Sequence, residues 1–286
     1  MRALFASLLI LGMTALPAAL IADHREWLTS VETALAQARQ NDQRILVDLY
    51  ADWCGWCKRL EEDVFSTQTF QEFAEDFVLL RVDTEDGAEG SRLQQRFDAY
   101  SLPTTLVLDH RQALIAEVMG YAPAPQYVAN IQQEIASFEE LIRGYERFGE
   151  ADDLRVLSLL ADEFHQRNDG DRAATLYRRM MATDPLTPDK EVRIRYQLID
   201  ALRLAARYDE ALEELDRARG MAAQMEEDPI FERFDLLAAQ VSLDRGDCDK
   251  AQLALENFLG THPTSDLFKV AERTLQTLKA KGFQCI

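Results

Sequence analysis

Residues 45–58 read ILVDLYADWCGWCK and hold two cysteines three positions apart, each preceded by a tryptophan. The aliphatic first half is typical of a buried strand, and the residues after Cys57 have helical spacing. Such a pair can be a redox couple, half of a metal site, or two small apolar residues in a core. The surrounding residues decide between these interpretations.

The position of the pair, where a strand meets a helix, favours redox chemistry. Unpaired backbone N–H groups of a first helical turn favour a Cys54 thiolate. Cys57, one turn further on the same face, could release a mixed disulfide that Cys54 had formed. Gly55 and the tryptophans indicate an exposed turn rather than a core. A structural zinc needs four ligands, but Cys248 and Cys285 are distant and the four histidines show no paired spacing. We therefore expect no metal.

The stretch belongs to a region in which strand-like and helix-like segments alternate. This alternation predicts an α/β fold with a mainly parallel or mixed sheet. The expected strands are residues 44–50, 78–84, 104–109 and 114–121.

Together, these features resemble the thioredoxin superfamily. ILVDLYADWCGWCK is followed by VFS at 64–66, VLL at 78–80 and SLPTT at 101–105. The combination most resembles the thioredoxin-like C-terminal domains of the DsbD family of thiol:disulfide interchange proteins. The resemblance covers roughly residues 25–137 and implies a thioredoxin fold with dithiol chemistry.

The resemblance also implies roles for individual residues. Cys54 would be the attacking thiol and Cys57 the resolving thiol. Pro103 matches the family's cis-proline beside the cysteines, an uncommon peptide bond with a specific role. Asp48 matches a buried acid that assists proton transfer from the resolving thiol. The alternative for Asp48 is a strand residue bonded only to nearby backbone.

The same resemblance places substrate-binding residues around the pair, namely Trp53, Gly55, Trp56, Leu102 and Thr104. Trp53 would shield the disulfide and line the substrate groove. Packing in a core is the competing role for this tryptophan.

Two departures from the family concern the direction of electron flow. Gly55 and Trp56 between the cysteines include no cation to stabilise a thiolate, which argues against a strong oxidant. Leu79 stands where thioredoxins carry a lysine near the buried acid, so proton handling by Asp48 is expected to differ. We expect a reductase or an isomerase.

Residues 1–22 contain one basic residue and then a nearly continuous apolar run, which is typical of a signal peptide. A retained membrane anchor is the alternative. Export to the periplasm or the exterior would allow disulfides to persist. The net charge of −19 repels phosphate backbones, so nucleic acid is not an expected partner.

After Pro123 and Pro125 the chain reads as helix after helix, beginning with a long helical run. Blocks within residues 150–265 share a small residue, a bulky residue four positions later and, in the outer blocks, a proline: Ala173, Tyr177 and Pro185; Ala211 and Leu215; Ala251, Leu255 and Pro263. Ala161 and Ala239 stand where two helices of a hairpin would touch. This layout resembles the tetratricopeptide repeat. The alanines lie 38 and 40 residues apart instead of the family's ~34, and Ile199 replaces one small residue.

In an oxidising compartment Cys248 and Cys285 could form a structural disulfide. Such a bridge would stabilise the fold by about 4 kcal/mol on the chain-entropy model. Two unpaired thiols are the alternative.

The sequence thus predicts a signal peptide at 1–22, a thioredoxin-like domain at 23–137 and a tetratricopeptide-like helical domain at 138–286. We expect an exported thiol-disulfide oxidoreductase without a cofactor. Its partners would be cysteine-containing exported proteins, a thiol electron donor, and a protein bound by the helical repeats. The alternative is a binding scaffold in which the repeats act and the first domain is a platform.

Overall fold

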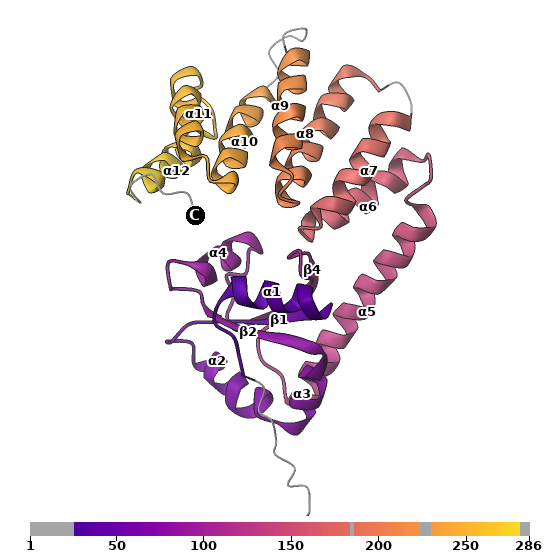
Figure 1. Ribbon diagram of the computed structural model, residues 1–286, viewed down its shortest axis with the longest axis vertical. Coiled ribbons are helices and arrows are strands. Elements are labelled where there is room, and N and C mark those ends of the chain that lie inside the picture. The colour runs from indigo at the N-terminus through magenta and orange to yellow at the C-terminus, as the bar shows by residue number, and fades with distance from the viewer. Residues whose placement is uncertain (1–25, 184–185, 223–229, 281–286) are drawn as a thin grey trace, which may run out of the picture.

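The computed structural model describes residues 26–183, 186–222 and 230–280. The predicted signal peptide and Cys285 lie outside these ranges. Figure 1 shows a sheet with flanking helices and an array of helices, with the long helix α5 (Ala124–Phe148) between them. Within the described ranges, no helix is long and apolar enough to cross a membrane. The predicted order of an α/β part followed by a helical part is confirmed.

A four-stranded mixed sheet forms the centre of the first part. Its order is β2-β1-β3-β4, with β1 parallel to β2 and antiparallel to β3, and β3 antiparallel to β4. The strands are β1 (Arg44–Tyr50), β2 (Phe77–Asp83), β3 (Thr104–Leu108) and β4 (Leu114–Met119), close to their predicted positions. Ile45 through Leu49 are all buried, as expected of a strand covered on both faces.

Helices cover both faces because successive strand residues point to opposite sides. Leu46 and Leu79 pack in one cluster with residues of α2, η1, α3 and α5. Val47 and Leu80 pack in a second cluster with residues of α1 and α4. These elements are α1 (Val31–Asn41), α2 (Gly55–Leu60), the π-helical η1 (Glu61–Phe65), α3 (Gln68–Phe73), the 3₁₀ turn η2 (Ala74–Asp76) and α4 (Glu89–Arg96).

The second part is a series of helices in which each packs against the next (Figure 1). They are α6 (Leu154–Gln166), α7 (Gly170–Thr183), α8 (Pro188–Leu204), α9 (Tyr208–Ala222), α10 (Ile230–Arg245), α11 (Cys248–Thr261) and α12 (Phe268–Ala280). The small residues of the predicted repeats, such as Ala161 and Ala239, are at most 1% exposed. A Cβ added to Gly170 would lie 2.2 Å from the carbonyl oxygen of Ala201. Helical packing is therefore close, and its assignment to the tetratricopeptide family stays a prediction.

The helix α5 passes from one part to the other. Tyr127 and Ile131, in its first half, belong to the core of the sheet, and Tyr145, in its second half, contacts the ring of Phe164 at 5.3 Å between ring centroids. The predicted domain boundary at residue 137 falls inside this helix. The division of the chain at that point stays a prediction.

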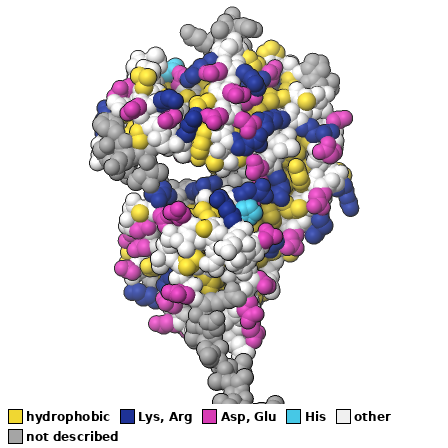
Figure 2. Space-filling view, viewed as in Figure 1, with side chains coloured by type: hydrophobic (Ala, Val, Ile, Leu, Met, Phe, Trp, Pro, Cys, Tyr) yellow, Lys and Arg dark blue, Asp and Glu magenta, His cyan; other side chains and the backbone are white. Residues whose placement is uncertain are grey.

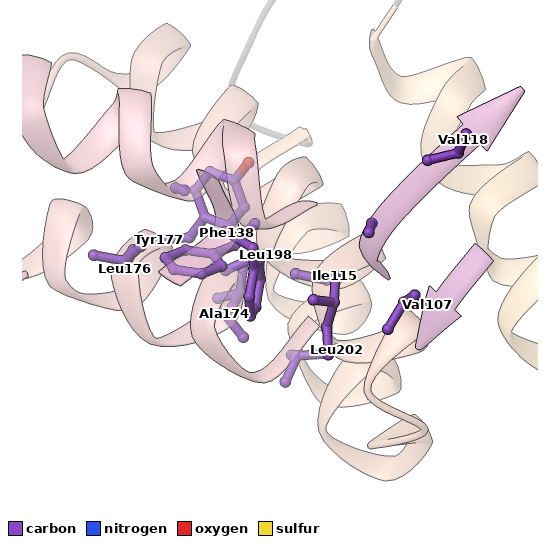
Figure 3. Packing of buried hydrophobic residues seen from close by; sticks show 14 of the residues in the cluster. Val107, Ile115, Val118, Phe138, Ala174, Leu176, Tyr177, Leu198 and Leu202 are labelled. Atoms are coloured by element: carbon purple, nitrogen blue, oxygen red, sulfur yellow. The ribbon is translucent and has the colours of Figure 1, made fainter. Parts of the chain in front are cut away.

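Side chains from the sheet and from the helical array form one continuous apolar cluster. Figure 3 shows Ile115 of β4 near Phe138, Leu198 and Leu202 of the helices. At the edge of this contact, the backbone N–H of Leu114 donates to the carbonyl oxygen of Arg167 at 2.7 Å. The two parts are therefore packed against each other.

Candidate active site

Strand β1 delivers Cys54 directly to the start of α2. The backbone N–H of Cys54 donates to the carbonyl oxygen of Ala51 at 3.0 Å, which closes the turn between strand and helix. Cys54 is the N-cap of α2, and Cys57 lies in the first turn of that helix. The two sulfurs form a disulfide, and the backbone N–H of Cys57 donates to Sγ of Cys54 at 3.1 Å. After reduction, the same N–H would stabilise a Cys54 thiolate.

Neighbouring residues cover most of the disulfide. Cys54 and Cys57 are 3% and 2% exposed, and they pack with Ala51, Tyr50 and Leu102. This covering restricts access to the sulfurs to the few groups that border them.

The loop before β3 brings a cis peptide bond to the site. The Leu102–Pro103 bond is cis, as predicted, and the carbonyl oxygen of Pro103 accepts from the backbone N–H of Gly120 at 2.8 Å. Within the described ranges, the backbone N–H and C=O of Leu102 make no hydrogen bond. Beside a disulfide, such groups can pair with an extended segment of another protein.

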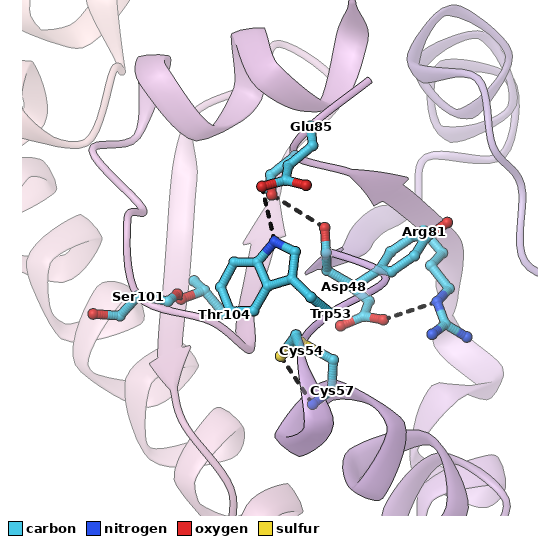
Figure 4. The surroundings of a disulfide bond; sticks show 10 residues. Asp48, Trp53, Cys54, Cys57, Arg81, Glu85, Ser101 and Thr104 are labelled. Carbon is cyan, nitrogen blue, oxygen red and sulfur yellow. Dashed lines mark hydrogen bonds and ion pairs between the residues drawn. A yellow bond between two sulfur atoms is a disulfide. The ribbon is translucent and has the colours of Figure 1, made fainter. Parts of the chain in front are cut away.

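Large apolar side chains stand exposed next to the disulfide. Trp53 is 68% exposed and Trp56 56%, although the indole N–H of Trp53 donates to Oε1 of Glu85 at 2.8 Å (Figure 4). The ring of Trp56 lies 5.5 Å from that of Tyr121, between ring centroids. The alternative role of Trp53 as a core residue is therefore wrong, and an apolar surface is available to a protein substrate.

Two predicted substrate-binding residues, Thr104 and Gly55, present no exposed apolar side chain beside the disulfide. Thr104 is fully buried, and its hydroxyl donates to the carbonyl oxygen of Ser101 at 2.5 Å. Its side chain is therefore held inside the cis-proline loop, and the predicted contact of Thr104 with a substrate stays a prediction. Gly55 begins α2 in open space, with no atom within 4 Å of an added Cβ, so packing does not require glycine there.

Asp48, in the middle of β1, is a buried carboxylic acid. It is 1% exposed, and burial raises its pKa from the ordinary value of 3.8 to about 7, against the opposing effect of Arg81. Neither oxygen accepts a hydrogen bond from the described residues, so the interpretation of Asp48 as merely bonded to backbone is wrong. Figure 4 shows its carboxylate between the disulfide and Arg81. The acid can therefore exchange a proton near neutral pH.

Arg81 of β2 is a residue of the site that was not predicted from the sequence. Its Nε lies 3.2 Å from Oδ2 of Asp48, its guanidinium lies 2.7 Å from Oε1 of Glu61, and it stacks over the ring of Tyr50 at 4.5 Å. Leu79, at the position of the family's lysine, is buried in the core. The cation near Asp48 therefore comes from a residue two positions later on the same strand.

Cys248 belongs to the helical array and is not part of this site. Cys248, at the start of α11, is disulfide-bonded, and Cys285 lies outside the described residues. Their pairing with each other stays a prediction. The described residues contain no group of three or more side chains arranged to hold a metal ion.

Comparison with known proteins defines the class of this site. Residues 26–110 match the family described as thioredoxin-like. This part of the chain is a thioredoxin-like domain, and Cys54 and Cys57 are its Cys-X-X-Cys pair. The predicted resemblance to the thioredoxin superfamily is confirmed.

More particularly, this domain is similar to the thiol:disulfide interchange protein DsbD. The chain is 34% identical over 108 residues to DsbD of Yersinia pestis (strain Pestoides F), which covers 37% of this chain and 18% of the relative. It is 30% identical over 113 residues to DsbD of Ralstonia nicotianae, covering 38% of this chain and 18% of the relative. The chain thus spans about a fifth of the length of these curated relatives.

Two solved structures are similar to the same region. The DsbH oxidoreductase has a TM-score of 0.38 and 18% identity, covering 44% of this chain and 94% of that chain. The oxidised C-terminal domain of Neisseria meningitidis DsbD has a TM-score of 0.33 and 16% identity, covering 38% and 99%.

Proposed function

We propose that the protein is an exported thiol-disulfide oxidoreductase that acts on cysteines of other exported proteins, in the reductase or isomerase direction. The observation that carries this proposal is the Cys54–Cys57 disulfide at the first turn of a helix. Beside it lie the unpaired backbone of Leu102 and the exposed indole of Trp56. These are the parts needed to bind an extended substrate and exchange its disulfide.

The proposed reaction transfers two electrons to the substrate. In the reduced enzyme, the Cys54 thiolate attacks one sulfur of the substrate disulfide, and the other sulfur leaves as a thiolate that takes a proton. Cys57 then loses its proton and attacks Sγ of Cys54, which releases the second substrate thiol and leaves the Cys54–Cys57 disulfide. Asp48 would accept the Cys57 proton, since its pKa of about 7 allows it to be ionised at neutral pH.

The direction follows from the residues between the cysteines. Gly55 and Trp56 are uncharged, so they give the reduced form no cationic stabilisation of the kind that makes strong oxidants. Working as a reductase, the enzyme would be recharged by a thiol electron donor. Export is supported by the apolar segment at residues 1–22, which is typical of a signal peptide.

The helical array is proposed to select protein partners. Arrays of packed helices often offer an extended binding surface, and Leu159 of α6 and Leu253 of α11 are large apolar side chains that stand 73% and 59% exposed. A surface of this kind would bind a protein on which the Cys54–Cys57 pair acts.

Replacing Cys57 with alanine should trap substrates as mixed disulfides. Without the resolving thiol, the bond between Cys54 and a substrate cysteine cannot be released internally. We expect covalent adducts on non-reducing gels that disappear with dithiothreitol, and mass spectrometry of the adducts identifies the substrates.

A double variant, Cys57→Ala with Cys54→Ser, is the matched control and should capture nothing covalently. If both variants bound the same partners without any covalent bond, the scaffold hypothesis would replace the enzyme.

A further inference from the structure

A second polar site lies where the sheet part meets the helical array. It is a cleft of about 670 Å³ lined by α1, α4, the β3–β4 turn, the start of α7 with the turn before it, α8, α9 and α10. Figure 2 shows Lys and Arg side chains, in dark blue, along the edges of the hollow between the two parts. None of the predicted active-site residues lines this cleft, so it is distinct from the disulfide site.

The cleft concentrates positive charge in a strongly acidic chain. The chain as a whole has a net charge of −19, yet the charged residues lining the cleft are five arginines and two aspartates: Arg39, Arg92, Arg96, Arg111, Arg203, Asp171 and Asp244. Arg92 and Arg96 lie one turn apart on α4, and folding adds arginines from α1, the β3–β4 turn and α8 to this pair. A counter-charge is needed to offset their repulsion.

The two aspartates of the cleft are already engaged. Asp171 lies 3.4 Å from a guanidinium nitrogen of Arg111 and 3.6 Å from one of Arg207. Asp244 lies 2.6 Å from a guanidinium nitrogen of Arg203. Neither carboxylate forms an ion pair with Arg39, Arg92 or Arg96.

Three guanidinium groups of the cleft have no carboxylate partner within the described part of the chain. Arg39 donates only to the backbone oxygen of His110 at 3.4 Å, and Arg92 makes no ion pair or hydrogen bond through its side chain. Arg96 donates to Oε1 of Gln112 at 3.3 Å, while its buried Nε has no partner. Arg39 is exposed, whereas Arg92 and Arg96 are half-buried, and a cation without a counter-ion becomes more costly as it is buried.

The surroundings of Arg96 show this cost. Burial, together with the nearby charge of Arg203, lowers the pKa of Arg96, and Asp244 only partly opposes the effect. Arg203 is paired with Asp200 and Asp244, yet its positive charge still disfavours the charged form of Arg96. An anion bound between α4 and α8 would offset this repulsion.

We propose that the cleft binds a small molecule that carries at least two anionic groups, either phosphates or carboxylates. A guanidinium group can form two parallel hydrogen bonds with the oxygens of a phosphate or a carboxylate. Three guanidinium groups without a carboxylate partner carry more positive charge than one singly charged anion would neutralise. The volume lies within the range of small-molecule sites. Amide side chains of Gln95, Asn168 and Gln240 at the cleft supply further donors. This inference does not depend on the redox chemistry of Cys54 and Cys57.

Calorimetric titration of the full protein tests the proposal, with sodium pyrophosphate and sodium citrate as separate probes in about 0.15 M salt. We expect saturable one-to-one binding of at least one probe with a Kd below about 1 mM. Arg92→Gln and Arg96→Gln should each weaken it about tenfold, the effect of one lost charge-assisted hydrogen bond. Tighter binding of pyrophosphate would assign the site to phosphates, and tighter binding of citrate to carboxylates.

Arg143→Gln on α5 is the matched control, because its guanidinium pairs with Glu140 and does not line the cleft. It should bind as the wild type does. Arg92→Gln is also expected to fold normally, because the Arg92 side chain makes no hydrogen bond or ion pair with the described residues. Absence of saturable binding of both probes, or equal binding by wild type and both cleft variants, overturns the proposal.

Discussion

Replacing Cys54 with serine is expected to abolish the reduction of insulin by the protein. The attacking group must be a thiolate, and a serine hydroxyl at the N-cap of α2 cannot form a mixed disulfide. The rate of insulin precipitation with dithiothreitol should fall to the rate that dithiothreitol gives alone, because no mixed disulfide can form. Turbidity measured over time at a fixed protein concentration gives this rate directly.

Substitution of a serine remote from the disulfide provides the comparison for this variant. Ser137 lies exposed on α5, so Ser137→Ala should retain full activity. Insulin reduction that persisted in Cys54→Ser would show that another group carries the chemistry.

Replacing Asp48 with asparagine is expected to stabilise the folded protein, and the effect should depend on pH. The folded pKa of about 7 lies above the ordinary value of 3.8. The folded state therefore binds more protons than the unfolded chain between these values, and wild-type stability falls as pH rises from about 4 to about 7. Above that range the full cost of the buried charge is present. At about pH 8, Asp48→Asn should raise the free energy of unfolding by on the order of 4 kcal/mol.

Urea denaturation at about pH 4 and about pH 8 measures this difference. Near pH 4 both side chains are neutral, so the gain should be small. Asp52→Asn, at an exposed acid beside the motif, is the control and should show little change at either pH. A stability gain of Asp48→Asn that was absent at high pH would contradict a buried carboxyl with a raised pKa.

Much of the first part could be predicted because local patterns determine it. The aliphatic run of β1 and its position before Cys54 predicted the strand-to-helix turn. Pro103 in SLPTT predicted the cis bond that the structure contains. In both cases the determining residues are adjacent in the chain.

The features that were not predicted depend on contacts between distant residues. Arg81 was missed because matching single positions pointed to Leu79, whereas the pairing of β1 with β2 puts Asp48 opposite Arg81. Residues 79 and 81 point to the same side of a strand because side chains alternate with a period of two. This periodicity could have identified Arg81 as the cation near Asp48. The burial of Thr104 likewise depends on how the sheet and its loop pack.

The arginine-lined cleft could not be predicted from local patterns at all. Arg39, Arg96 and Arg203 come from α1, α4 and α8. They meet only because the helical array packs against the sheet, through contacts such as that of Leu114 with Arg167. Charge composition pointed in the opposite direction, since the chain is acidic overall.

The reduction potential of the Cys54–Cys57 couple tests the central claim most directly. The protein would be equilibrated in thiol buffers, its free thiols alkylated, and each cysteine quantified by peptide mass. A reversible couple closer to ~ −270 mV than to ~ −120 mV is the expected result and supports a reductase or isomerase. A value near ~ −120 mV would contradict the proposed direction. A pair that did not cycle would contradict the redox function itself.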